Sequence, residues 1–284
     1  MKHLILPALL FASCTAVAPP LADPTGVDVV WTASGFDMPE SVIAGEGVYY
    51  VSNVNGEGSE ADGNGYISKL GADGEVLERR WVEGTTALPL NAPKGMAIVG
   101  GTLFVTDIDA VVAIDLARAA VTARLPVEGA EFLNDAESYQ GALLVSDSRT
   151  GDIHRVADGV VSLFREASLE TERLNGIYCC DGEEVLLATM GAGELLALGT
   201  DGSVRVRGTG MENADGIVPV GNGYVVSSWS GQLRYVEEGE ATLLLDTSGD
   251  EISHNDIAPP IPGTGVDVVS PNWRPGTVTA YRVR

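Results

Sequence analysis

A short motif recurs along this chain with a nearly constant spacing of about forty residues. Each copy places one polar or charged residue directly before a run of apolar residues. The first two copies are 54 residues apart, and every later spacing is 40 or 41 residues. The six anchor residues are Glu40, Lys94, Asn134, Asn175, Asp215 and Asn255. A period of this length predicts a closed repeat architecture, because a single repeat cannot bury its own apolar face.

Each of the first five repeats contains four short apolar stretches separated by turn residues, which predicts four antiparallel strands. Repeats of this kind form the blades of a β-propeller. The sixth repeat supplies only three stretches, at residues 257–258, 266–270 and 277–283, whereas residues 27–32 precede the first repeat without a partner. We therefore expect an all-β, six-bladed propeller over residues 23–284, with four-stranded blades and a ring closed by the N-terminal strand in the last blade.

The charge of the chain limits its partners. Its 40 acidic residues outnumber 17 basic ones, for a formal net charge of −23. Such a chain repels phosphate backbones, so we expect no nucleic-acid partner. The acidic excess is compatible with cation binding, although solubility is the simpler explanation.

The N-terminus is typical of an export signal. A basic start precedes an apolar run at residues 4–12, which is too short to span a bilayer. We expect residues 1–22 to be a signal peptide, with cleavage after Ala22 and a periplasmic or secreted mature protein. Alternatively, Cys14 lies in a sequence similar to a lipoprotein box, which predicts a lipid anchor. No other segment is apolar enough to be a transmembrane span.

Cys179 and Cys180 are adjacent in an apolar, strand-like stretch. An oxidising compartment permits a disulfide between them, although such a ring is strained. The alternative is that both pack as small side chains on opposite faces of a strand. No Cys or His cluster accompanies them, so they do not suggest a metal site.

The innermost strand of each blade lines the axis of a propeller, so the six anchors should converge at one mouth of the central channel. The Gly after Asn175 should allow the chain to turn sharply into its strand. Residues that end the second strands should form an outer wall around this mouth: Asn53, Asp107, Asp147, Met190, Trp229 and Asn272. An insertion at residues 55–65 explains the longer first spacing and should cover the mouth as a lid.

Four of the anchors offer only oxygen ligands. Glu40 and Asp215 supply carboxylates, and Asn134 and Asn175 supply amide oxygens. Two carboxylates crowded about one axis repel each other unless a cation lies between them. This donor set favours Ca²⁺; Mg²⁺ and Mn²⁺ are compatible with it, and Zn²⁺ suits it less because no His or Cys joins the set. The competing explanation is that Asn, Asp and Gly simply form the turns before each strand.

The same four positions carry a resemblance to a known family. The chain resembles the senescence-marker-protein/gluconolactonase (regucalcin-like) family, which is related more distantly to paraoxonases, diisopropylfluorophosphatase and strictosidine synthase. These are six-bladed propellers with a divalent metal in the channel. Their ligands are a first-blade Glu, a third-blade Asn, a fourth-blade Asn in an Asn-Gly pair and a fifth-blade Asp in an Asp-Gly pair. The matching residues are Glu40, Asn134, Asn175 and Asp215.

The resemblance implies a metal-dependent hydrolase that acts on a small-molecule lactone or ester. It implies that Asp215 is both a ligand and the general base, while Lys94 could stabilise an oxyanion or hold a substrate carboxylate. Lys94 occupies the second-blade position where paraoxonase-like enzymes carry a His, which is a departure from the pattern. The alternative is a non-catalytic propeller that binds a ligand or a protein. The residues expected to contact substrate are Lys94, Asp107, Asp147, Met190, Trp229, His254 and Asn255.

Overall fold

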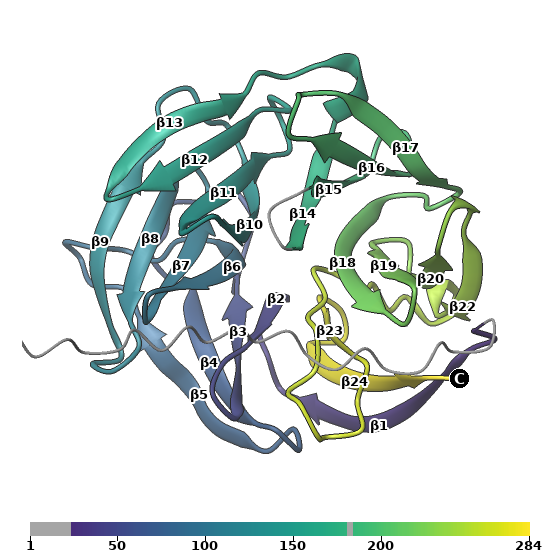
Figure 1. The fold of residues 1–284 in the computed structure, drawn as a ribbon. Coiled ribbons are helices and arrows are strands. Elements are labelled where there is room, and N and C mark those ends of the chain that lie inside the picture. Colours follow the sequence, from purple (N-terminus) through teal and green to yellow (C-terminus); the bar gives the residue numbers. More distant parts are fainter. Residues whose placement is uncertain (1–23, 181–183) are drawn as a thin grey trace, which may run out of the picture.

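The computed structural model describes residues 24–180 and 184–284. It forms six sheets arranged around one axis, and in each of the first five the first strand lies nearest that axis (Figure 1). The predicted six-bladed propeller is therefore confirmed. The expected signal peptide at residues 1–22 and the lipid-attachment candidate Cys14 lie outside the described residues. Within the described ranges, no helix has the length and apolar character needed to cross a bilayer.

The first five blades each contain four strands in consecutive order from the axis outward. Blade one comprises β2 (Pro39–Ala44), β3 (Val48–Asn53), β4 (Tyr66–Gly71) and β5 (Val76–Glu83). Blade two comprises β6 (Pro93–Val99), β7 (Thr102–Asp107), β8 (Ala110–Asp115) and β9 (Ala120–Pro126). Blade three comprises β10 (Leu133–Tyr139), β11 (Ala142–Asp147), β12 (Ile153–Ala157) and β13 (Val160–Arg165). Blade four comprises β14 (Leu174–Cys180), β15 (Glu184–Thr189), β16 (Glu194–Gly199) and β17 (Val204–Thr209). Blade five comprises β18 (Ala214–Val220), β19 (Gly223–Ser228), β20 (Gln232–Val236) and β22 (Thr242–Asp246).

Three short elements lie outside this plan. The two-residue strand β21 (Gly239–Glu240) pairs in parallel with β17 and so joins blade five to the edge of blade four. Two 3₁₀ helices occur in connections, η1 (Leu169–Thr171) before blade four and η2 (Ser248–Asp250) before blade six.

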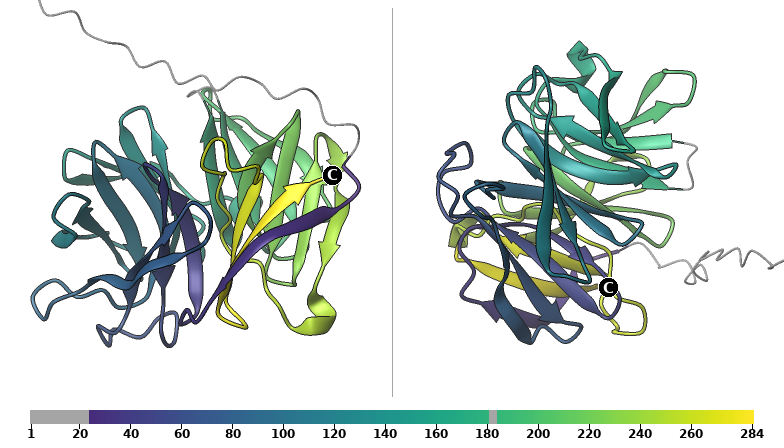
Figure 2. Two further views of the ribbon diagram at one scale, coloured as in Figure 1. Left: turned by 90° about the horizontal axis from the view of Figure 1, so that it is seen from below. Right: turned by 90° about the vertical axis from the view of Figure 1, so that its left-hand side faces the viewer.

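The sixth blade closes the ring as expected. β1 (Val27–Ser34) pairs antiparallel with the C-terminal strand β24 (Thr277–Val283), which pairs with β23 (Val268–Asn272). The first and last parts of the chain therefore lie side by side in one sheet (Figure 2). The innermost position of this blade is reduced to isolated bridges, Ala258 with Val269 and Ser41 with Asp256. The Arg284 guanidinium lies 3.2 Å from the Asp28 carboxylate and adds an ion pair at the closure.

A β-bulge occurs at the anchor in each of the first five blades. The pairing register of the first two strands shifts between Leu133 and Ala136 in blade three, and between Leu174 and Ile177 in blade four. The same shift occurs in blades one, two and five. An extra residue in one strand redirects its side chains relative to the ladder. The repeated motif therefore marks a repeated bulge.

Hydroxyl groups near the ends of the second strands connect neighbouring blades. Ser146 Oγ accepts a hydrogen bond from the Asp135 amide at 3.0 Å and donates to the Asn175 carbonyl at 2.6 Å. Ser227 Oγ accepts from the Gly216 amide at 2.8 Å and donates to the Asn255 carbonyl at 2.6 Å. Each hydroxyl thus holds the bulge of its own blade and the anchor of the next blade. These hydrogen bonds from side-chain hydroxyls to backbone groups hold neighbouring anchors at a fixed spacing.

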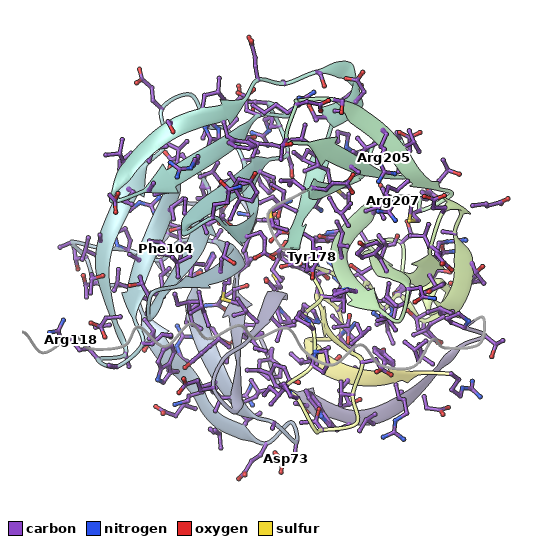
Figure 3. All side chains as sticks on the ribbon, in the orientation of Figure 1. Asp73, Phe104, Arg118, Tyr178, Arg205 and Arg207 are labelled. Atoms are coloured by element: carbon purple, nitrogen blue, oxygen red, sulfur yellow. The ribbon has the colours of Figure 1, made fainter. Side chains whose placement is uncertain are left out.

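The apolar core is divided among the interfaces between blades. For example, Leu186 and Ala197 of blade four pack in one cluster with Ile217 and Val226 of blade five. Figure 3 shows Tyr178, on the innermost strand of blade four, close to the centre of the ring, whereas Arg205 and Arg207 lie on that blade's outer strand. Inner strands such as β8 and β11 are buried along nearly their whole length, because each sheet packs against a neighbouring blade on both faces.

Candidate functional site

A cavity of about 580 Å³ opens at the end of the axis where the innermost strands begin. It receives residues from all six blades. They are Glu40, Gly58, Ser59, Lys94, Phe132, Asn134, Ser148, Arg149, Arg173, Asn175, Met190, Trp229 and Trp273. The predicted convergence of the anchors at one mouth is thus seen directly for Glu40, Lys94, Asn134 and Asn175.

Buried oxygen atoms of two cavity residues, Glu40 and Asn175, lie near those of Asp215, which is buried beneath the cavity. All three residues are at most 2% exposed. Glu40 Oε2, Asn175 Oδ1 and both carboxylate oxygens of Asp215 accept no hydrogen bond of good geometry, although the side chains of Trp229 and Asn175 are close enough to Asp215 to oppose the rise of its pKa. A buried polar atom left without a partner costs free energy unless something else satisfies it. Four such oxygens from three blades fit the coordination of a hard divalent cation.

Asn134 adds an amide oxygen to this group of oxygens because a hydrogen bond fixes the orientation of its side chain. Its Nδ2 donates to Ser148 Oγ at 2.9 Å, which leaves its amide oxygen available to the cavity. Ser148 Oγ in turn donates to the Leu174 carbonyl at 2.5 Å, so blade four helps to hold the blade-three amide. Among the described residues, no three His, Cys, Asp or Glu side chains form a metal-binding group. The proposed site therefore depends on two amides as well as two carboxylates.

The electrostatics of the two carboxylates show that they share a poorly solvated space. Burial raises the pKa of Glu40 to about 8; the nearby charge of Asp256 adds to this rise, and that of Lys94 opposes it. Burial and the charge of Glu40 raise the pKa of Asp215 well above its usual value. A cation between them would favour the ionised forms of both.

Lys94 is a buried cation at the second-blade anchor. It is 2% exposed, and its Nζ donates to the Ala92 carbonyl at 3.0 Å. The same Nζ lies 4.4 Å from the centre of the Phe132 ring. Burial lowers the pKa of Lys94 to about 8, and the charges of Glu40 and Asp107 oppose this shift. Below that pH the ammonium group remains charged inside the cavity.

The cavity walls are mainly apolar and aromatic. Met190 and Trp229, both expected to contact substrate, do line the cavity. Trp273 also lines it, with its ring centre 5.4 Å from that of Trp229. Phe132 forms the wall beside Lys94. Such a surface suits a ligand with an apolar body.

Three other residues expected to contact substrate, Asp107, Asp147 and Asn255, do not line the cavity. Their side chains accept hydrogen bonds from backbone amides instead. Asp107 accepts hydrogen bonds from the Asn91 and Ala92 amides and pairs with Arg124. Asp147 accepts from the backbone amides of Glu131, Phe132, Arg149 and Thr150. Both carboxylates hold the loops that carry cavity residues. Asn255 is fully buried, and its Oδ1 accepts from the Trp273 amide at 3.2 Å.

His254 is also fully buried, away from the cavity lining. Its Nδ1 lies 2.9 Å from Ser270 Oγ and 3.0 Å from Asn272 Nδ2, and its Nε2 lies 3.1 Å from Thr247 Oγ1. This polar network anchors the connection into blade six and so supports Trp273.

The buried imidazole makes stability depend on pH. Burial lowers the pKa of His254 from 6.5 to about 4. Between these values the unfolded chain binds a proton that the folded chain does not. The free energy of unfolding should therefore decrease as pH falls from 6.5 to 4, with a His254 contribution of up to about 3 kcal/mol. Urea unfolding across this range should show a shallower dependence in His254→Gln, because the contributions of other groups cancel in the comparison. Parallel curves for the two proteins would contradict this role.

The 55–65 insertion reaches the cavity, as expected. Gly58 and Ser59 line it. A Cβ placed on Gly58 would lie 3.6 Å from Phe132 and 3.9 Å from Lys94, so the loop touches the wall. Asn55 Nδ2 donates to the Asn64 carbonyl at 2.9 Å, and the Gly63 amide donates to Asn91 Oδ1 at 3.1 Å. These bonds fix both ends of the insertion.

Sequence reasoning missed Phe132, Arg149, Arg173 and Trp273 as cavity residues. Each lies within two residues of an anchor or of a second-strand end. The residues that flank the anchors and the second-strand ends could therefore have been included among the predicted cavity residues. The structure does not decide between the two alternatives for Cys179 and Cys180, a disulfide or two separately packed side chains, because the Cys180 side chain lies outside what the structure describes.

The fold and the site together define a six-bladed propeller with an oxygen-lined cavity on its axis. Solved structures share this fold. A protein provisionally assigned as a gluconolactonase is 14% identical, with 93% of this chain and 95% of that chain covered and a TM-score of 0.66. A streptogramin B lyase is 12% identical, with 91% and 97% covered and a TM-score of 0.64. A chain of a nidogen/laminin complex is 14% identical, with 74% and 86% covered and a TM-score of 0.55.

No protein-family model matches the sequence, and no curated protein is significantly similar to it. At identities of 12% to 14%, the structural likeness shows the fold alone. The neighbours include proteins described as enzymes and one described in a protein–protein complex. Function must therefore be argued from the site.

Proposed function

We propose that this protein is a metal-dependent hydrolase that acts on a lactone or ester. The observation that carries this proposal is the group of buried, unpartnered oxygens of Glu40, Asn175 and Asp215 at the base of an aromatic cavity. With Asn134 they would hold a divalent cation, Ca²⁺ being best suited to the donor set. The bound cation would supply Lewis acidity, which polarises an ester carbonyl and lowers the pKa of water.

The residues around this site have complementary tasks. Asp215 would serve as ligand and as the general base that accepts a proton from the attacking water. Phe132, Met190, Trp229 and Trp273 would exclude bulk water and hold the apolar part of the substrate. Exclusion of water strengthens every electrostatic interaction in the cavity.

Lys94 would stabilise the negative charge that develops on the carbonyl oxygen. Its Nζ donates a hydrogen bond to the Ala92 carbonyl, and an ammonium group has three donors, so it can still donate to a substrate oxygen. Burial lowers the pKa of Lys94 to about 8 in the metal-free protein, and a bound cation would lower this pKa further by opposing the charge of Glu40. The contribution of Lys94 should therefore fade as pH rises towards 8. A preorganised donor of this kind typically contributes about 10²–10³-fold to kcat.

The proposal is tested by assaying a panel of lactones and aryl esters with Ca²⁺, Mn²⁺ or Zn²⁺, with and without a chelator. We expect hydrolysis that the chelator removes and added metal restores. Asn175→Ala should reduce it at least about 10²-fold, since loss of a ligand weakens the site, whereas the outer-blade variant Gln232→Ala should match the native protein. Metal binding without turnover of any substrate would instead favour a ligand- or protein-binding propeller. Turnover that is insensitive to the chelator and to Asn175→Ala would overturn the metal-dependent mechanism.

A further inference from the structure

The mouth of the cavity carries an unusual concentration of positive charge for this chain. Lys94 lies at the base, and Arg149 and Arg173 lie exposed at the rim. The acidic residues of the site are Glu40, which lines the cavity, and the fully buried Asp215 beneath it. The whole chain has just 17 basic residues against 40 acidic ones. Three cations at one opening therefore oppose the field of the rest of the molecule.

Both rim arginines line the cavity. The Arg149 guanidinium carbon lies 5.6 Å from the centre of the Phe132 ring, the same ring that Lys94 contacts. Arg173 ends the connection before β14, and its carbonyl accepts a hydrogen bond from the Met190 amide at 3.0 Å. In the described ranges, neither guanidinium forms an ion pair, in contrast to Arg124 and Arg205, which pair with acidic side chains.

The charge balance of the occupied site strengthens this point. A divalent cation would neutralise the carboxylates of Glu40 and Asp215, which leaves the positive charges of Arg149 and Arg173 uncompensated. A concave, partly apolar opening focuses such a field on whatever enters it. The aromatic side chains of Trp229 and Trp273 form the apolar wall below the rim.

We propose that the substrate is an amphipathic anion, an ester or lactone whose aromatic body carries a carboxylate, and that Arg149 and Arg173 bind this carboxylate at the rim. The inference rests on the proposed function for the ester group alone. The aromatic body would contact Trp229 and Trp273, and the ester would reach the oxygen-lined base. Arg149 and Arg173 are therefore specificity residues, separate from the residues that carry out hydrolysis.

Binding is tested first, with probes that cannot be hydrolysed. In the native protein, 2-naphthoate should bind about tenfold more tightly than neutral 2-naphthamide at low salt, and the difference should shrink as salt is added. The fluorescence of the cavity tryptophans measures the binding of each probe. In the double variant Arg149→Gln/Arg173→Gln the two probes should bind within about threefold of each other. The control Arg155→Gln/Arg165→Gln has the same charge change near a different cavity and should keep the native preference.

Hydrolysis is tested with the matched esters 4-acetoxybenzoate and methyl 4-acetoxybenzoate. The anionic ester should have the higher kcat/KM, and the double variant should lose this preference through KM while kcat for the neutral ester stays within about twofold of native. Equal binding of the two naphthyl probes to the native protein would overturn the inference, as would a carboxylate preference that survives in the double variant. If no ester or lactone of the panel is hydrolysed but the arginines still select naphthoate, the hydrolase proposal fails and the anion site stands.

Discussion

Asp215→Asn should make the protein more stable in a chelator and at the same time remove its stabilisation by Ca²⁺. In the metal-free protein, burial and the charge of Glu40 raise the pKa of Asp215 well above its usual value. At pH 8 this carboxyl is ionised in the unfolded chain. Folding must therefore either protonate the carboxyl or bury its charge, and both cost free energy. A neutral amide of the same shape avoids that cost, and we expect the metal-free free energy of unfolding to rise by about 1–3 kcal/mol.

Ca²⁺ should stabilise the native protein but not the Asp215→Asn variant. At a Ca²⁺ concentration one hundred times the Kd, binding stabilises the native fold by about 2.7 kcal/mol, which raises the Tm by about 5–10 °C for a domain of this size. The variant lacks the ionised ligand and should show little change. Thermal unfolding of both proteins with chelator and with Ca²⁺ gives all four values. If both proteins are stabilised equally by Ca²⁺, Asp215 is not a ligand.

The pH dependence of the metal-free protein provides a second readout of the same site. Burial, with the charge of Asp256, raises the pKa of Glu40 from 4.5 to about 8. Between these values the folded chain holds a proton that the unfolded chain has released. The stability contribution of this carboxyl is therefore greatest below pH 4.5 and is lost as pH rises to 8. Glu40→Gln should flatten this decline.

Gly176→Ala should destabilise the protein strongly even though it adds a single methyl group. A Cβ at this position would lie 2.0 Å from the Asp215 carbonyl oxygen and 3.3 Å from Ala188 Cβ. The nearest atom is backbone of the next blade's innermost strand, so it cannot move aside as a side chain could. We expect a loss of about 3 kcal/mol or more, and a fall in Tm of about 10 °C. Any relaxation would separate Asn175 from Asp215, so metal affinity should fall as well.

A matched substitution separates this steric effect from a general cost of replacing Gly. Gly249, in η2, has no atom within 4 Å of the corresponding Cβ position. Gly249→Ala should therefore change the Tm by less than about 2 °C. A Gly176→Ala protein with native Tm and native metal affinity would show that the innermost strands can separate freely.

The close approach at Gly176 also corrects an expectation from the sequence. Gly176 was expected to permit a sharp turn through its conformational freedom. Its φ is not among the positive values found in the chain, so an L-residue could adopt the backbone conformation. Gly216 behaves in the same way, since its Cβ would lie 2.3 Å from the Ile257 amide nitrogen. The requirement comes from the neighbouring blade, which no local pattern can reveal.

Residues at the ends of the second strands show a similar limit. Asp107 and Asp147 pair with the residue before the anchor of their blade, and their carboxylates accept hydrogen bonds from the amides of the loop that enters that blade. In blade five this place belongs to Ser228, which pairs with Ala214, so Trp229 lies one residue further along and lines the cavity. This shift of one residue decides between a backbone contact and a cavity position, and the sequence pattern alone does not reveal it.

The sequence by itself determined the number of blades, the closure of the ring and the convergence of the anchors. These features depend on period, apolar runs and strand count, all of which are local and repeated. Only the tertiary structure decided that hydroxyls such as Ser146 tie one blade to the next, and that Arg149, Arg173 and Trp273 share one mouth with Lys94. Contacts between blades join residues far apart in the chain, and their geometry follows from the twist and spacing of neighbouring sheets.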